Sequence, residues 1–104
     1  MQFSRPEKTV MHIPDGVDPV DAVERATHLG IGAHQDDLEI MAAEGVLACY
    51  ESNELWFGGV TVNDGASAPR TGDFANFSNE EMAVERIEEQ NRAADLGQYA
   101  FQIQ

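Results

Sequence analysis

The sequence is short of positive charge. It has 6 lysines and arginines against 19 aspartates and glutamates, which gives a formal net charge of -13. Lys8 is the only lysine. This excludes any mechanism that needs a catalytic or phosphate-binding lysine farther along the chain. A surface this acidic repels phosphate backbones and anionic lipid headgroups. We therefore expect neither nucleic acid nor a membrane surface as a partner.

Cysteine is scarce, and long apolar runs are absent. Cys49, the single cysteine, cannot form an internal disulfide, and there is no Cys-x-x-Cys pair to hold a structural zinc. The longest mostly apolar stretch, residues 40–50, is short and contains Glu44, which rules out a membrane span. The first residues carry no apolar core of a secretory signal. These absences predict a soluble protein in the reducing cytoplasm.

The remaining composition is that of one small globular domain. Hydrophobic residues make up 42% and charged residues 24% of the 104 residues, which excludes a disordered or fibrous chain. Residues 1–20 contain three of the four prolines and are typical of an extended arm, to which residues 19–26 could add one short helix. We therefore divide the chain into an N-terminal arm, residues 1–26, and a domain, residues 27–104.

Within the domain, strand and helix patterns alternate. Three segments predict strands by their apolar, aromatic or alternating residues: 27–34, 55–62 and 99–103. Apolar residues at helical spacing predict one helix over about 37–51. Ser78 and Glu81 have the spacing of a capping box, which predicts a second helix that runs to Leu96 and ends at a left-handed Gly97.

This order predicts an α/β fold with a mainly parallel sheet and right-handed crossovers. The sequence stops on a strand with no helix after it to cover the sheet. We therefore expect an incomplete domain, the first part of a larger one. A last strand left uncovered would also favour association of copies into a homo-oligomer.

The strongest candidates for functional residues follow the first predicted strand, where open α/β sheets place their ligand sites. His34 leaves the strand and Asp37 opens the helix, so both side chains could meet on one metal ion. A catalytic zinc takes three protein ligands and leaves one position for water, and Asp36 could take the proton of that water. The same spacing is typical of an acidic helix start beside a half-buried histidine, so spacing alone leaves both interpretations open.

Three segments resemble one known family. Residues 32–40, Gly-Ala-His-Gln-Asp-Asp-Leu-Glu-Ile, resemble the A-H-P-D-D-x-E motif of the LmbE-like, or PIG-L, zinc-dependent deacetylases. Residues 60–65 resemble the second strand of that family and its following loop, and residues 86–97 resemble its R-x-x-E…A-A-x-L-G helix. The resemblance covers residues 27–104 and implies the N-terminal part of a Rossmann-like, three-layer α/β sandwich.

The resemblance also implies a chemistry: hydrolytic removal of an acetyl group from N-acetylglucosamine-type or related N-acetylated sugar conjugates. His34 and Asp37 would bind zinc, and Asp36 would activate the water as the catalytic base. Arg86 matches the family's arginine and would bind the substrate. The sequence departs from the pattern at Gln35, which replaces a proline, and no histidine follows His34 to serve as the family's downstream third ligand.

Two hypotheses from other classes stay open. A response-regulator receiver domain also has an acidic pair after its first strand, where Asp36 and Asp37 would bind magnesium and Asp64 would accept phosphate. It requires a late lysine, which this sequence lacks. A non-catalytic acidic α/β module that binds a protein partner would keep the fold without the metal. Zinc content would separate the module from the enzyme. Apart from these hypotheses, Arg86 lies on a charged helix and could simply pair with Glu89.

Overall fold

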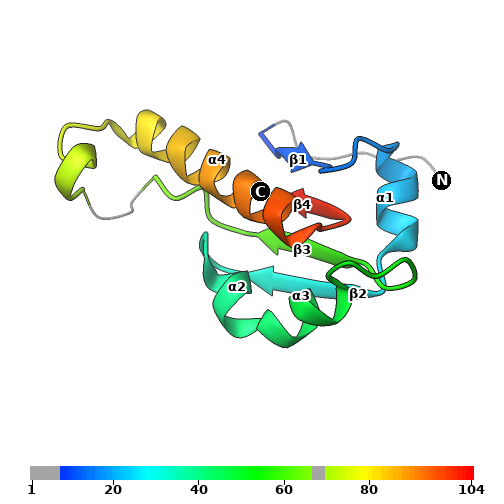
Figure 1. The fold of residues 1–104 in the computed structure, drawn as a ribbon. Helices are drawn as coiled ribbons and strands as arrows, with labels where there is room; N and C mark the ends of the chain where they lie inside the picture. The colour runs from blue at the N-terminus through cyan, green and yellow to red at the C-terminus, as the bar shows by residue number, and fades with distance from the viewer. Residues whose placement is uncertain (1–7, 67–69) are drawn as a thin grey trace.

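The computed structural model describes residues 8–66 and 70–104. In these ranges the chain forms a compact α/β fold with a mixed, mostly parallel sheet (Figure 1). The strands are β1 (Met11–His12), β2 (His28–Gly32), β3 (Phe57–Thr61) and β4 (Phe101–Ile103). The helices are α1 (Pro19–Arg25), α2 (Asp37–Met41), α3 (Ala43–Cys49) and α4 (Asn79–Gly97), with a 3-10 turn at Gly72–Phe74.

The sheet has the strand order β1-β4-β3-β2. β2 pairs with β3 in parallel, from His28 opposite Phe57 to Gly32 opposite Thr61. β3 pairs in parallel with β4. The parallel pairing predicted for residues 27–34 and 55–62 is therefore confirmed, and the carboxyl ends of these strands lie at one edge of the sheet.

The N-terminal arm contributes a strand that the sequence did not predict. β1 pairs antiparallel with β4, and the backbone N–H groups of Val10 and Gln104 each donate to the other residue's carbonyl, at 2.7 and 2.8 Å. β4 therefore lies inside the sheet, and the expectation of an uncovered last strand is wrong. A strand of two residues shows no alternation of its own, so only the pairing with β4 reveals it.

The helix predicted over residues 37–51 is two helices. Ala42 leaves the helical conformation, with φ -110° and ψ 21°, and ends α2 while it begins α3. Leu38 before the break and Val46 after it still pack on the same core cluster. The apolar periodicity thus continues across the break, which is why the sequence pattern predicts a single helix.

The capping box at the start of α4 is confirmed. The Ser78 hydroxyl accepts from the Glu81 N–H at 3.1 Å, and the Glu81 carboxylate accepts from the Ser78 N–H at 3.2 Å. The left-handed residue at the other end is Gln98, φ 56°, and not Gly97 as predicted. Gly97 is needed for space instead, because a Cβ there would lie 2.6 Å from the Tyr99 ring.

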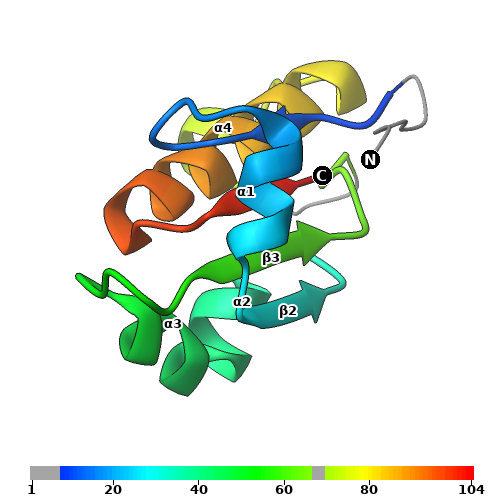
Figure 2. The ribbon, with the colours of Figure 1, turned by 90° about the vertical axis from the view of Figure 1, so that its right-hand side faces the viewer.

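Helices pack on both faces of the sheet. Side chains alternate along a strand, so Phe57 and Val60 of β3 point to opposite faces. Phe57 belongs to the cluster under α2, α3 and α4, where its ring meets the Tyr99 ring edge to face at a centroid distance of 4.8 Å. Val60 belongs to the cluster formed with Ala22 of α1. Figure 2 shows α1 crossing in front of the strands while α4 runs behind them.

Candidate functional site

Residues 32–40, which resemble the deacetylase motif and are called the motif below, lie at the carboxyl end of β2 and the start of α2. β2 ends at Gly32, and α2 begins five residues later at Asp37. The loop after β3 lies against it, because the N–H groups of Val62 and Asn63 donate to the carbonyls of Gly32 and Ala33 at 3.0 and 2.9 Å. The sheet thus holds the motif beside the loop that follows the neighbouring strand.

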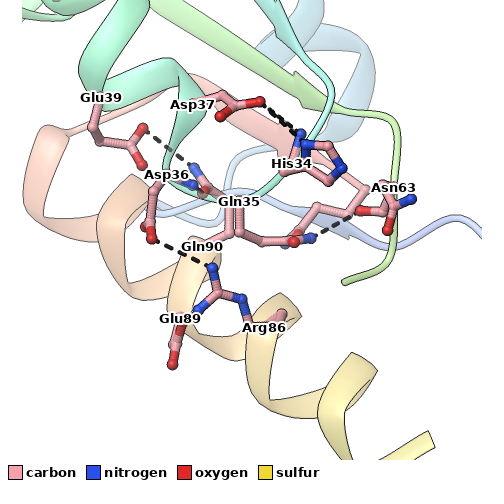
Figure 3. Close-up of polar contacts among 10 residues, drawn as sticks. His34, Gln35, Asp36, Asp37, Glu39, Asn63, Arg86, Glu89 and Gln90 are labelled. Atoms are coloured by element: carbon pink, nitrogen blue, oxygen red, sulfur yellow. Dashed lines mark hydrogen bonds and ion pairs between the residues drawn. The ribbon is translucent and has the colours of Figure 1, made fainter. Parts of the chain in front are cut away.

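The structure brings His34 and Asp37 together. The Asp37 carboxylate accepts a hydrogen bond from the backbone N–H of His34 at 2.9 Å. Its Oδ2 atom also lies 3.7 Å from His34 Nδ1, and the His34 ring is exposed (Figure 3). Two ligand atoms that are each about 2.1 Å from one zinc ion can be at most about 4.2 Å apart. The pair is therefore close enough to share a zinc ion.

Asp36 faces a different way. Its carboxylate extends towards α4, where Oδ2 lies 3.5 Å from Arg86 Nη2, and Figure 3 shows it turned away from the His34–Asp37 pair. Its backbone is left-handed, with φ 73°, and its N–H donates to Oε1 of Gln90 at 3.0 Å. A non-glycine residue in this conformation is strained by about 1 kcal/mol and is often found at functional sites.

Arg86 projects from α4 and joins two carboxylates. Its Nη1 atom donates to Glu89 at 2.8 Å, while Nη2 reaches Asp36. Its Nε atom is buried without a hydrogen-bond partner among the described residues. Gly65 of the loop after β3 packs on its stem, where a Cβ would lie 2.6 Å from Arg86 Cβ. The pairing of Arg86 with Glu89, which is the plain structural alternative to a role in substrate binding, is thus present together with the contact to Asp36.

Sequence reasoning missed a buried polar network behind the motif. The Gln90 side chain is fully buried and donates through Nε2 to Glu39 and to Gln102, at 3.3 Å in each case. Gln102 in turn donates to the Thr61 hydroxyl at 2.9 Å. Gln90 shares the buried side of α4 with Met82 and Ala94. A glutamine at the helical spacing of these apolar residues was the signal that could have revealed the network.

Tyr99 joins this network through Glu39 of α2. Its hydroxyl donates to Glu39 Oε2 at 2.5 Å. Burial of the ring, followed by the hydrogen bond to Glu39 and the negative charge of that residue, raises the pKa of Tyr99 far above its usual value. Tyr99 therefore remains a neutral donor that holds the Glu39 carboxylate, and with it the first turn of α2.

Gln35 occupies the place where the family resemblance expects proline. Its side chain is buried and donates to the Asn63 carbonyl at 2.9 Å and to Gln104 Oε1 at 3.2 Å. The amide thereby ties the motif to the loop after β3 and to the residue after β4. It fixes the loop by hydrogen bonds where a proline would fix it through its ring.

The donor set fits zinc only in part. His34 and Asp37 supply two ligand atoms at a suitable distance. In residues 8–66 and 70–104, no three His, Cys, Asp or Glu side chains come together as a group that could hold a metal ion. A full catalytic zinc site needs one ligand more than these residues provide.

Comparison with protein-family models, curated proteins and solved structures finds no match to this chain. As for membranes, none of the helices in the described part of the chain combines the length and the apolar character that a transmembrane helix needs. The site must therefore be judged on its own geometry.

Proposed function

We propose that this chain carries part of the active site of a zinc-dependent N-deacetylase, similar to the LmbE-like family, that acts on N-acetylated sugar conjugates. The observation that supports this most strongly is the 3.7 Å approach of His34 Nδ1 and Asp37 Oδ2 at the carboxyl end of β2. A Rossmann-like, three-layer arrangement and a cytoplasmic setting belong to the same proposal. Helices on both faces of the sheet and a single, buried cysteine are consistent with them.

In this proposal His34 and Asp37 hold the metal, and a third ligand comes from outside the described residues. Zinc, when bound, polarises an amide carbonyl and lowers the pKa of water. The hydrogen bond from the His34 N–H to the Asp37 carboxylate fixes the positions of the two ligand residues relative to each other. The tie between Gln35 and Asn63 keeps their loop in place.

In this proposal Asp36 is the catalytic base, and Arg86 binds the substrate. The exposed Asp36 carboxylate accepts the proton from the attacking water, while the guanidinium 3.5 Å away offers a positive charge to the acyl oxygen of the substrate. The hydrogen bond from the Asp36 N–H to Gln90 holds the base on its strained backbone. For catalysis the Asp36 carboxylate must turn from Arg86 towards the His34–Asp37 pair.

A second candidate is a non-catalytic acidic module that binds a protein partner. It is favoured by one observation: Arg86 already pairs with both Asp36 and Glu89. In this case the three residues serve only to hold the motif loop against α4.

A zinc titration by calorimetry distinguishes the two. We expect weak binding by the native chain, and an affinity lower by about tenfold or more in His34→Ala and in Asp37→Ala, because each removes one of two ligands. His12→Ala is the matched control, because His12 is also a histidine beside an aspartate, 2.6 Å from Asp95. It should bind zinc as the native chain does. Equal binding by all four proteins would overturn the metal site and leave the acidic module.

Acetate release from an N-acetylglucosamine conjugate tests the chemistry. With zinc alone the chain should release little acetate, because two ligands position the metal poorly. Free imidazole, offered as the missing third ligand, should increase the release, and Asp36→Ala should abolish the increase. An imidazole effect that survives in Asp36→Ala would exclude Asp36 as the base.

A further inference from the structure

The outer edge of β2 is unprotected. Among residues 8–66 and 70–104, only β3 pairs with β2. The strand reads His-Leu-Gly-Ile-Gly and has no lysine, proline or acidic residue, the residues that usually keep edge strands from pairing. In a chain with a net charge of -13, this edge is a place where two copies can approach without direct charge repulsion.

The backbone groups that this edge offers can be assigned. The His28 N–H donates to the Trp56 carbonyl, and the Gly32 carbonyl accepts from the Val62 N–H, both at 3.0 Å on the β3 side. In a parallel ladder, alternate residues direct their N–H and C=O groups to the same neighbour. The N–H and C=O groups of Leu29 and Ile31 therefore point outward, away from β3.

The side chains of the same two residues are exposed on the sheet. Leu29 and Ile31 pair with Gly58 and Val60, so they stand on the face that carries α1, and they are 60% and 63% exposed. Gly30 lies on the opposite face, where α2 covers it and a Cβ would meet the Phe57 ring at 2.7 Å. The edge thus combines four backbone groups that no described residue pairs with and two exposed apolar side chains.

We propose that a second copy of this chain pairs with β2 edge to edge, antiparallel, about a two-fold axis that passes between the two Gly30 residues. In this register Leu29 lies opposite Ile31 of the second copy, and Ile31 lies opposite Leu29 of the second copy. Each of the two pairs exchanges both N–H···O bonds, so all four outward groups are used. Gly30 meets its own counterpart in the close, non-hydrogen-bonded position, where the absence of a side chain allows the backbones to approach.

A stable dimer needs more interface area than β2 alone supplies, and exposed residues of α2 can add to it. A specific interface buries roughly 800 Å² per partner, more than a five-residue strand supplies. Ile40 and Met41 of α2 are 76% and 69% exposed. Figure 2 shows α2 beside β2 at this end of the sheet. These side chains add apolar surface next to the paired strands, so the dimer is a continuous sheet flanked by helices.

Sedimentation equilibrium in EDTA tests the association independently of zinc binding and of deacetylation. Over a range of about 1–100 μM, the native chain should change from monomer to dimer. Ile31→Lys should raise the dissociation constant by about tenfold or more, although it lowers the net negative charge, because it places a charge opposite the apolar Leu29 in each pair and two like charges at diagonal positions. Val84→Lys is the matched control: it makes the same charge change at an exposed apolar residue of α4, and it should dimerise as the native chain does.

A double variant tests the register. Leu29→Glu combined with Ile31→Lys places opposite charges across both cross-strand pairs, so dimerisation should return relative to Ile31→Lys alone and should weaken as salt is added. Circular dichroism establishes that each variant is folded. A native chain that is monomeric over the whole range, or a dimer that Ile31→Lys leaves intact, would overturn the proposal. A double variant that stays monomeric would overturn this register.

Discussion

At the scale of single residues, Asp36 has the most strained backbone conformation in the motif. Its φ of 73° lies in the left-handed region, where a Cβ is unfavourable and glycine is not. Aspartate tolerates this region better than most residues, and the hydrogen bond to Gln90 holds it there. The strain is therefore a property of the position and can be measured apart from the carboxylate.

Two substitutions at Asp36 make this measurement. Asp36→Gly and Asp36→Ala both remove the contact with Arg86, which is exposed and contributes little. We expect Asp36→Gly to be more stable than Asp36→Ala by about 1 kcal/mol in urea unfolding, because only glycine adopts the left-handed backbone without cost. Equal stability of the two variants would show that the backbone of residue 36 is unstrained or relaxes freely.

Tyr99 makes the stability depend on pH. Its pKa is raised in the folded chain, by burial first and then by Glu39, above the usual value near 10 that it regains on unfolding. Below pH 10 the native contribution of Tyr99 is complete. Above pH 10 the unfolded state loses the phenol proton that the native state keeps, so stability should fall by up to about 1.4 kcal/mol per pH unit.

The comparison of native chain and Tyr99→Phe isolates this effect. Tyr99→Phe should be less stable by about 1–3 kcal/mol at pH 7, because Glu39 loses a hydrogen-bond donor in a part-buried place. Its stability should also fall less steeply between pH 9.5 and 11. Tyr50→Phe is the control, because Tyr50 is exposed, and it should keep the native slope. Identical slopes in all three proteins would argue against a protonated Tyr99 in this range.

At the scale of elements, α4 is the longest helix that the structure describes and presents Arg86 and Gln90 to the motif. The position of both residues depends on where the helix begins. Ser78→Ala removes one half of the capping box and should cost about 1 kcal/mol in unfolding free energy. Ser78→Thr keeps a hydroxyl and should remain within a few tenths of a kcal/mol of the native chain. A loss of similar size in both variants would point to packing instead of the cap.

At the scale of the whole molecule, the sheet brings the site together. Residues of the motif, of the loop after β3 and of α4 come from distant parts of the sequence, and Asp36 and Arg86 are 50 residues apart. They meet because two parallel crossovers return the chain to the same edge of the sheet. Among the described residues, β1 pairs with β4 at one end of the sheet, and β2 forms the edge at the other end, on which the proposed dimer is built.

The sequence by itself determined what depends on near neighbours in the chain. The strands near residues 28–32, 57–61 and 101–103, the capping box at Ser78 and the parallel pairing follow from local patterns and from the order of the elements. The placement of His34 and Asp37 at a strand-to-helix junction follows from the same patterns. Each of these depends on a few adjacent side chains or on the handedness of a crossover, so no knowledge of distant contacts was needed.

Only the tertiary structure decided what depends on contacts between distant residues. It paired the arm with β4, interrupted the helix at Ala42, and turned Asp36 towards Arg86 and away from the metal-ligand pair. It also joined Gln90, Glu39 and Tyr99 in one buried network. Neither a two-residue strand nor a single broken turn has a repeating local pattern, and the helical spacing of Gln90 indicates its burial but not the groups that it contacts. Their conformations are set by whichever groups the folded sheet brings within hydrogen-bonding distance.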